Sequence, residues 1–73
     1  MADLRTVPII LCLETATKLC SVALTRDGQV LSSRNEEGDK HVHAEKVNVF
    51  IDEVMREADL TLRELSAVAV GIG

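Results

Sequence analysis

The chain has 73 residues, of which 47% are hydrophobic, and it contains one Phe, no Tyr and no Trp. This length allows at most one small domain, and an aliphatic core without large aromatic side chains gives such a domain little stability. The formal net charge is −4, from 12 acidic and 8 basic residues. This balance argues against a self-sufficient nucleic-acid binder, which presents a basic patch with stacking aromatics. A subunit of an RNA-acting complex whose partner supplies the positive surface stays open.

Residues 9–13 form an unbroken apolar run, which suits a short strand buried on both faces better than an amphipathic helix. We expect this strand at about 8–14, because Pro8 is tolerated at the first residue of a strand. The polar end of the strand and the turn after it comprise Glu14, Thr15, Ala16 and Thr17. Open α/β sheets place their ligand sites at such strand ends, so these residues form the first candidate site.

Two more strands are expected at about 19–26 and 29–35. Between them, Asp27 and Gly28 give the strongest hairpin signal in the chain, because glycine accepts a positive φ without steric cost. The third strand is polar enough to be an edge, so the three strands are predicted to form an antiparallel meander.

The periodicity becomes helical over about 42–58. The apolar stripe of this helix comprises Ala44, Val47, Phe50, Ile51, Val54, Met55 and Ala58. Val42 and Val49 interrupt the opposite, polar face, as ordinary surface valines or as contacts with a partner helix. His41, His43 and Glu45 carry metal-ligating groups, but helical residues two apart point in different directions, so no metal site is predicted.

Thr61 and Glu64 have capping-box spacing, which predicts a short helix at about 61–65, and residues 67–72 are interpreted as a buried strand. A right-handed crossover places this strand parallel to the first, giving an α/β fold with sheet order 3-2-1-4. The last strand would be an unpaired apolar edge, which natural proteins avoid. We therefore expect residues 1–73 to form an incomplete N-terminal lobe, either a fragment or a chain completed by another chain.

Localisation and redox chemistry can also be predicted from the sequence. Cys12 and Cys20 are too few for a disulfide framework and are expected to be buried free thiols, although paired strands can bring two cysteines together. Residues 1–5 lack the features of a signal peptide, and no apolar run approaches the roughly 18 residues of a membrane span. We expect a cytoplasmic protein with no membrane partner.

Residues 10–17 and 20–24, together with Gly28, resemble the opening of the bacterial TsaB family. Members of this family, formerly described as glycoprotease-like, are subunits in the biosynthesis of threonylcarbamoyladenosine in tRNA. With His43 and residues 65–73, the resemblance covers nearly all of 8–73. It implies a lobe of the actin, hexokinase and heat-shock-ATPase type (ribonuclease H-like), with the sheet order 3-2-1-4-5.

The resemblance also implies a function. The chain would be a non-catalytic subunit that supports a TsaD-type catalytic subunit, with a TsaE-type ATPase associated and tRNA contacted indirectly. The partner would hold the nucleotide and the metal, so this chain would carry no cofactor and the residues from Glu14 to Thr17 would be a vestigial nucleotide site. The first-lobe helices of the family contact TsaD or a second copy, and the contact residues implied here are Val42, Val47, Val49, Phe50 and Val54.

The alternative function is the N-terminal lobe of a nucleotide-using enzyme, either a sugar-kinase-like ATPase or a metallo-transferase. A TsaD-type chain would show a His-x-x-x-His motif in its continuation. A peptidase is not supported, because no nucleophile, base and orienting group stand together in the sequence. Glu14 forms no acid–base pair, and its plainer interpretation is that it accepts hydrogen bonds from the turn that follows.

Overall fold

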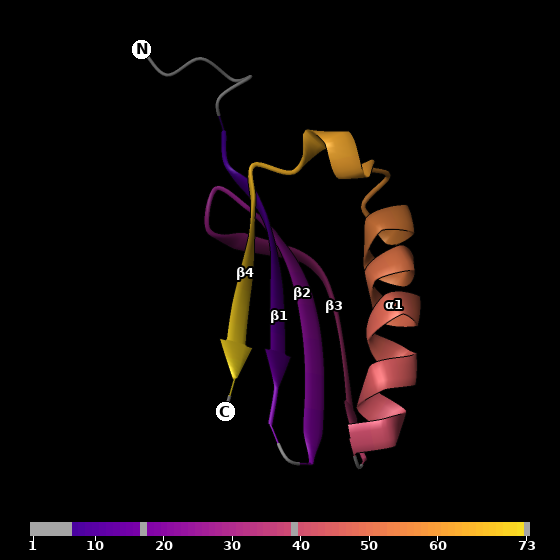
Figure 1. The fold of residues 1–73 in the computed structure, drawn as a ribbon. Coiled ribbons are helices and arrows are strands. Elements are labelled where there is room, and N and C mark those ends of the chain that lie inside the picture. The colour runs from indigo at the N-terminus through magenta and orange to yellow at the C-terminus, as the bar shows by residue number, and fades with distance from the viewer. Residues whose placement is uncertain (1–6, 17, 39, 73) are drawn as a thin grey trace.

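A computed structural model describes residues 7–16, 18–38 and 40–72, and the side chains of all of these except 40–44 and 72. The elements are β1 (Ile9–Thr15), β2 (Leu19–Arg26), β3 (Gln29–Glu37), α1 (Lys40–Glu57), a 3₁₀ turn (Leu62–Glu64) and β4 (Ala67–Ile72). The predicted α/β fold is confirmed: the sheet has the order β3-β2-β1-β4, with β1 antiparallel to β2 and parallel to β4 (Figure 1). No helix in the described part of the chain is long and apolar enough to cross a membrane.

The β2–β3 hairpin turns at Asp27 and Gly28, whose φ angles are 51° and 80°. Two consecutive positive φ values give the turn a twist that matches the twist of the paired strands. The pairing shifts after Leu24, which lies opposite Ser32, while Thr25 lies opposite Val30. Leu31 is therefore an extra residue that forms a bulge in β3.

α1 ends in a Schellman motif at Asp59, which has a φ of 57°. The N–H of Asp59 donates to the Arg56 carbonyl at 3.1 Å, and the N–H of Leu60 donates to the Met55 carbonyl at 3.0 Å. A single 3₁₀ turn follows where a short helix was expected at about 61–65. As the capping-box spacing predicted, Glu64 Oε1 accepts from Thr61 N at 3.4 Å and from Thr61 Oγ1 at 3.2 Å.

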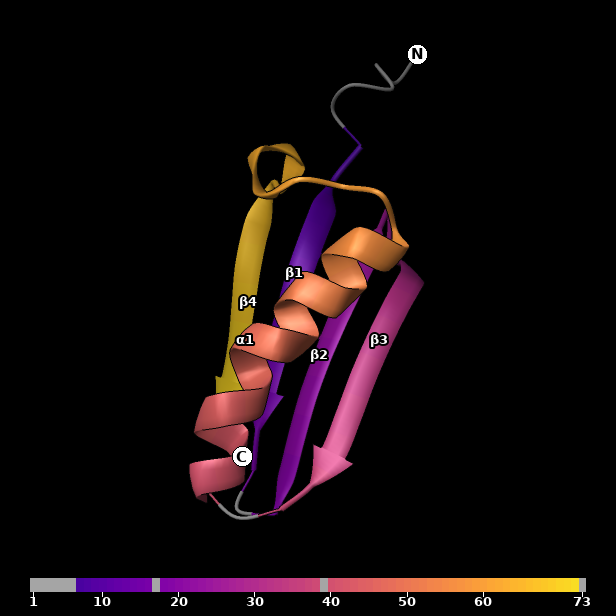
Figure 2. The same cartoon turned by 90° about the vertical axis from the view of Figure 1, so that its right-hand side faces the viewer.

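The core lies between the sheet and α1, which crosses one face of the sheet diagonally (Figure 2). Side chains alternate across a strand, so every second residue of β1 and β2 faces the helix. The buried core residues are Ile9, Leu11, Cys20, Val22, Leu24, Phe50, Val54 and Met55. No described element covers the other face of the sheet. Cys12 on that face is therefore half-buried rather than buried as predicted.

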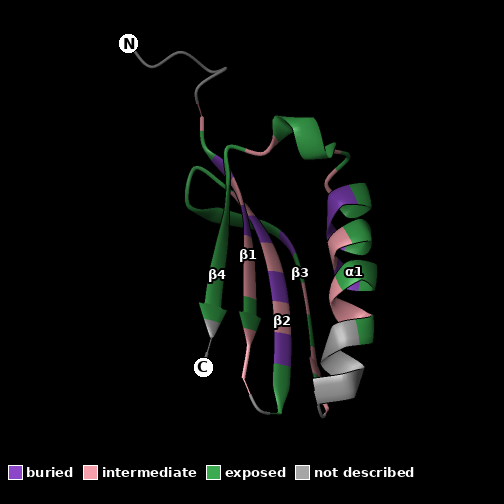
Figure 3. Cartoon of the chain, in the orientation of Figure 1, coloured by how far each residue is buried: buried purple, intermediate pink, exposed green. Residues whose placement is uncertain are grey.

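β4 differs most from its prediction. Residues 67–71 are all exposed, although the apolar run was interpreted as a buried strand (Figure 3). The cause is the position of α1, which packs mainly on β2 and β3 and leaves β4 at the far edge uncovered. The start of β4 is joined to the start of β1 by Ser66, which donates its N–H to the Ile9 carbonyl at 2.7 Å. Ser66 Oγ in turn accepts from Ile9 N at 3.0 Å.

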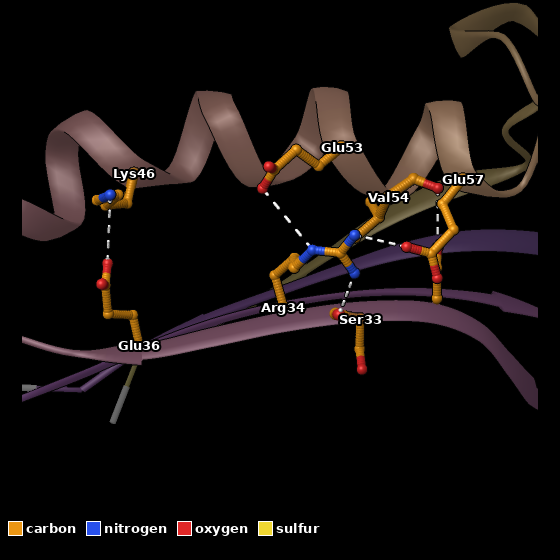
Figure 4. A network of polar contacts seen from close by, with 8 residues as sticks. Ser33, Arg34, Glu36, Lys46, Glu53, Val54 and Glu57 are labelled. Atoms are coloured by element: carbon orange, nitrogen blue, oxygen red, sulfur yellow. Dashed lines mark hydrogen bonds and ion pairs between the residues drawn. The ribbon is translucent and has the colours of Figure 1, made fainter.

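Polar side chains on β3 connect that strand to α1 (Figure 4). Ser32, which is buried, donates from its hydroxyl to the Val54 carbonyl at 2.8 Å. The Arg34 guanidinium hydrogen-bonds Glu57 and lies 3.7 Å from Glu53 Oε1. Alternate residues of β3 thus point toward the helix, so α1 is held over β2 and β3.

Candidate functional site

The first candidate site is the end of β1, where Glu14 lies between Ser21 of β2 and Gly71 of β4. Glu14 is exposed, and its Cγ is 3.7 Å from where a Cβ on Gly71 would stand. The carboxylate therefore stands at the carboxyl ends of two parallel strands, which is where open α/β sheets bind ligands. Thr15 is half-buried beside it, and Thr17 lies outside the described residues.

The turn after β1 is closed by its backbone. The N–H of Ala16 donates to the Leu19 carbonyl at 2.8 Å, and the reciprocal bond is 3.4 Å. Among the described residues, none of the side-chain hydrogen bonds involves the Glu14 carboxylate, so the structure does not support the expectation that Glu14 accepts hydrogen bonds from this turn. One exposed carboxylate can attract a cation or accept a proton, but acid–base catalysis needs a second positioned group.

Metal-ligating side chains are scattered in the described part of the chain, where no group of three or more His, Cys, Asp or Glu is placed to hold a metal ion. The side chains of His41 and His43 lie outside the described residues. The two cysteines lie on opposite faces of the sheet and are free thiols. Burial, followed by the nearby Glu36 carboxylate, raises the pKa of Cys20, so its reactive thiolate is scarce at neutral pH.

The second candidate site is α1, on which five contact residues were predicted. Phe50 is 8% exposed and Val54 is fully buried, and both face the chain's own sheet. Val47 is half-buried against the same core. These three side chains stabilise the fold and are not available to a partner in this structure. Val49, which is 49% exposed, points away from the core, and the side chain of Val42 lies outside the described residues.

An acidic and polar surface surrounds Val49. Glu45 and Asp52 lie about one helical turn from Val49, on either side of it along the helix, and Asn48 directly precedes it. All three are exposed. Asp52 Oδ2 is paired with Arg56 Nε at 3.0 Å, so the uncompensated charge near Val49 comes mainly from Glu45. We call Glu45, Asn48, Val49 and Asp52 the outer face of α1. An apolar centre with an acidic rim fits a partner with an apolar pocket and basic surroundings.

A surface hollow that the sequence did not reveal lies between the second half of α1 and the residues after it. Its volume is about 340 Å³, and it is lined by Asn48, Ile51, Asp52, Met55, Arg56, Leu60, Thr61 and Leu62. Leu62 is exposed at its rim. The signal for this hollow in the sequence is the pair of leucines on either side of Thr61, and the capping-box spacing of Thr61 says nothing about them.

Comparisons with known proteins agree with this fold. No protein-family model matches the chain, and no curated protein matches it significantly. A solved structure of YeaZ (TsaB) from Pseudomonas aeruginosa has 32% sequence identity and a TM-score of 0.79, covering 90% of this chain and 30% of that one. A structure described as an uncharacterized protein with similarity to peptidase YeaZ from Pseudomonas aeruginosa has 31% identity and a TM-score of 0.76, covering 88% and 29%.

The chain thus spans less than a third of the length of these two structures. Identity above 30% over nine-tenths of the chain goes beyond a shared architecture. The likeness to YeaZ and the sheet order β3-β2-β1-β4 are both consistent with the actin- and ATPase-like lobe that the sequence resemblance implied. The chain is therefore TsaB-like in both sequence and fold over the residues compared.

Proposed function

We propose that this chain is a non-catalytic, TsaB-like partner subunit in the bacterial complex that makes threonylcarbamoyladenosine in tRNA. In this role it binds and supports a TsaD-type catalytic subunit. The likeness to YeaZ (TsaB) over 90% of the chain carries the proposal. The nucleotide and the metal belong to the partner, a TsaE-type ATPase associates with the complex, and tRNA is contacted through the partner. The complex works in the cytoplasm.

The outer face of α1 is the contact surface in this proposal. Val49 is an exposed apolar side chain on the otherwise polar outer face of α1. Protein interfaces commonly have such an apolar centre, enclosed by a polar rim. Phe50 and Val54, in contrast, hold α1 to the sheet from the opposite side. The interface therefore depends on the core indirectly, because the core fixes the direction in which Val49 points.

Co-purification of the chain with a tagged TsaD-type subunit tests this proposal. Val49→Asp places a charge at the centre of the contact surface and should abolish co-purification without unfolding the chain, since the side chain is exposed. The matched control is Val30→Asp, which changes another exposed valine at the β2–β3 hairpin and should leave binding intact. Phe50→Glu is unsuitable, because it would break the core.

Each result has a distinct meaning. A wild-type chain that fails to bind the TsaD-type subunit contradicts the proposed function. Wild-type binding that survives in folded Val49→Asp keeps the function and removes the outer face of α1 as the contact surface. A second copy of this chain bound through the same face would appear as a homodimer that Val49→Asp dissociates.

A second candidate function is favoured by the position of Glu14. An exposed carboxylate next to Gly71, at the ends of two parallel strands, suits the metal-organising role that this position has in nucleotide-using relatives. Calorimetric titration with Mg-ATP tests it. Measurable binding by the wild type that is lost in Glu14→Gln supports a nucleotide-using lobe, and no binding by the wild type contradicts it.

A further inference from the structure

A second surface pocket lies at the end of the sheet where β1 and β4 begin. Its volume is about 520 Å³, which is within the range of about 300–1,000 Å³ that is typical of small-molecule sites. Its apolar lining consists of Val7, Ile9 and Leu65. β1 and β4 run from this pocket to the opposite end of the sheet, where Glu14 lies, so the pocket is separate from the first candidate site (Figure 1).

Backbone hydrogen bonds fix the walls of this pocket. Ser66, which directly precedes β4, donates its N–H to the Ile9 carbonyl at 2.7 Å. On the other side of β1, Arg26 at the end of β2 lies opposite Ile9. The N–H of Asp27, the next residue, donates to the Pro8 carbonyl at 2.9 Å. The pocket is therefore built from segments that the chain's own pairing holds in place, and the 3₁₀ turn before Ser66 completes it.

Two arginines of the pocket, Arg26 and Arg63, differ from most other basic residues of the chain. Three basic side chains in the described part of the chain are paired with carboxylates: Arg34, Lys46 and Arg56. No salt bridge or side-chain hydrogen bond between described residues involves Arg26 or Arg63, and both are exposed. The two guanidinium groups therefore have their donors available for a ligand in the pocket.

Ser66 adds a third donor to the pocket. Its Oγ accepts from Ile9 N at 3.0 Å, which leaves the hydroxyl hydrogen to donate, and no described group accepts it. Glu64, the acidic residue of the lining, is engaged elsewhere, because its Oε1 accepts from Thr61 N at 3.4 Å and from Thr61 Oγ1 at 3.2 Å. The unused hydrogen-bonding groups of the pocket are therefore mainly donors, which suit a ligand with several acceptor oxygens.

A phosphate monoester matches these donors. At pH 7 it carries a charge of about −1.5 to −2 and three strong acceptor oxygens. Two guanidinium groups match that charge, and their planar forks bind phosphate oxygens in a bidentate manner. The apolar lining offers a wall for the organic part of the ligand. We propose that this pocket binds the phosphate monoester of a small organic molecule through Arg26 and Arg63, with the Ser66 hydroxyl as a third donor.

The charges beside the pocket favour a small ligand over a nucleic acid. Asp27 directly follows Arg26, Glu64 directly follows Arg63, and the whole chain has a formal net charge of −4. A nucleic acid carries one charge on every phosphate and extends beyond the pocket, so its neighbouring phosphates would meet these carboxylates. A monoester concentrates its charge on a single group and avoids this repulsion.

An NMR titration of the full chain with phenyl phosphate tests the proposal. The backbone amide signals of Arg26, Arg63 and Ser66 should shift in a saturable manner. Arg26→Gln and Arg63→Gln should each weaken binding at least about tenfold, because each removes hydrogen bonds between charged groups. Arg56→Gln is the matched control. It changes the net charge equally at another exposed arginine, which pairs with Asp52 on α1, and should leave the affinity unchanged.

Two further ligands test the charge and the size that the pocket requires. Phenyl sulfate has the same ring but a single negative charge, so it should bind at least about tenfold more weakly than phenyl phosphate. A single-stranded oligonucleotide should produce no saturable shift at Arg26, Arg63 or Ser66, because of the carboxylates beside the pocket.

Three results would overturn the proposal. The first is the absence of a saturable shift at the pocket with phenyl phosphate. The second is an unchanged affinity in folded Arg26→Gln and Arg63→Gln. The third is phenyl sulfate or the oligonucleotide binding as tightly as phenyl phosphate. None of these results bears on the TsaD-type partner, because that contact is proposed at Val49 on α1 and is measured separately by co-purification.

Discussion

β3 and β4 border the same sheet, but α1 packs against β3 and leaves β4 bare. An α-helix is about 10 Å wide and neighbouring strands are about 4.8 Å apart, so one helix covers about two strands. α1 therefore packs mainly on β2 and β3, the core beneath it also buries Ile9 and Leu11 of β1, and β4 stays uncovered. The contrast between β3 and β4 shows that the apolar pattern of a strand does not determine its burial. A neighbouring layer must be present to cover it.

The two faces of the sheet also differ in cover, and the two cysteines, which lie on opposite faces, should show the largest effect. Cys20 is fully buried beneath α1, whereas Cys12 is half-buried on the bare face next to β4. We expect iodoacetamide to label Cys12 at least roughly 100-fold faster than Cys20, because Cys20 must wait for opening of the core. Mass spectrometry of Cys12→Ala and Cys20→Ala measures each thiol separately. Equal labelling rates in native buffer would show that α1 does not protect β2.

A matched pair of valines tests the division by stability. Val22→Ala should lower the free energy of unfolding by about 2 kcal/mol, because it removes two buried methyl-sized groups and leaves a cavity. Val70→Ala, the same change on β4, should stay within about 0.5 kcal/mol. Urea unfolding at low protein concentration compares them. Similar losses in the two variants would mean that β4 is covered in the monomer.

The buried bond between β3 and α1 should have a smaller effect. Ser32→Ala removes the hydroxyl that donates to the Val54 carbonyl and should lower the free energy of unfolding by about 1 kcal/mol. The loss is modest because the Ala58 N–H still donates to that carbonyl, at 3.2 Å. Ser33→Ala, whose side chain is exposed, is the control and should be neutral. Equal effects of the two changes would show that this bond does not hold α1 to β3.

The smallest expected effect lies in the connection between α1 and β4. Asp59 has a φ of 57°, which costs an L-residue energy but costs glycine nothing. Asp59→Gly should therefore raise the free energy of unfolding by about 0.5–1 kcal/mol. Asp59→Asn removes the charge at the helix C-terminus without freeing the backbone, so thermal unfolding of both variants separates the two causes. A destabilised Asp59→Gly would contradict the Schellman geometry.

Local chemistry predicted the topology of this chain well. Asp27 and Gly28 specify the hairpin by backbone conformation alone, and the handedness of crossovers places β4 beside β1. Burial was harder to predict. The stripe that contains Phe50 and Val54 has the same period whether it covers its own sheet or a partner, so its periodicity could not assign these residues to the core. The run 67–72 likewise has the composition of a buried strand and lacks a cover.

The sequence predicted the site at Glu14 better than the contact residues on α1, because the first depends on local structure and the second on how the helix packs. Glu14 lies where the strand pattern put it, at the end of β1, because a strand end is a local property. Which residue of α1 faces outward depends on the direction from which the helix meets the sheet. The buried core fixes that direction, and Ser32 and Arg34 on β3 add polar contacts to α1 that sequence periodicity does not reveal.

The Ser66–Ile9 pair has a consequence for how the chain is made. The two residues are 57 positions apart, so the bonds that align β4 with β1 can form only when the ribosome has added 57 residues after Ile9. At about 5–20 residues per second, this interval lasts roughly 3–11 s. Until then β1, rather than β4, is the edge of the emerging hairpins. Neighbouring nascent chains on a polysome therefore meet Ile10 and Leu11 before the ribosome has supplied the strand that pairs with them.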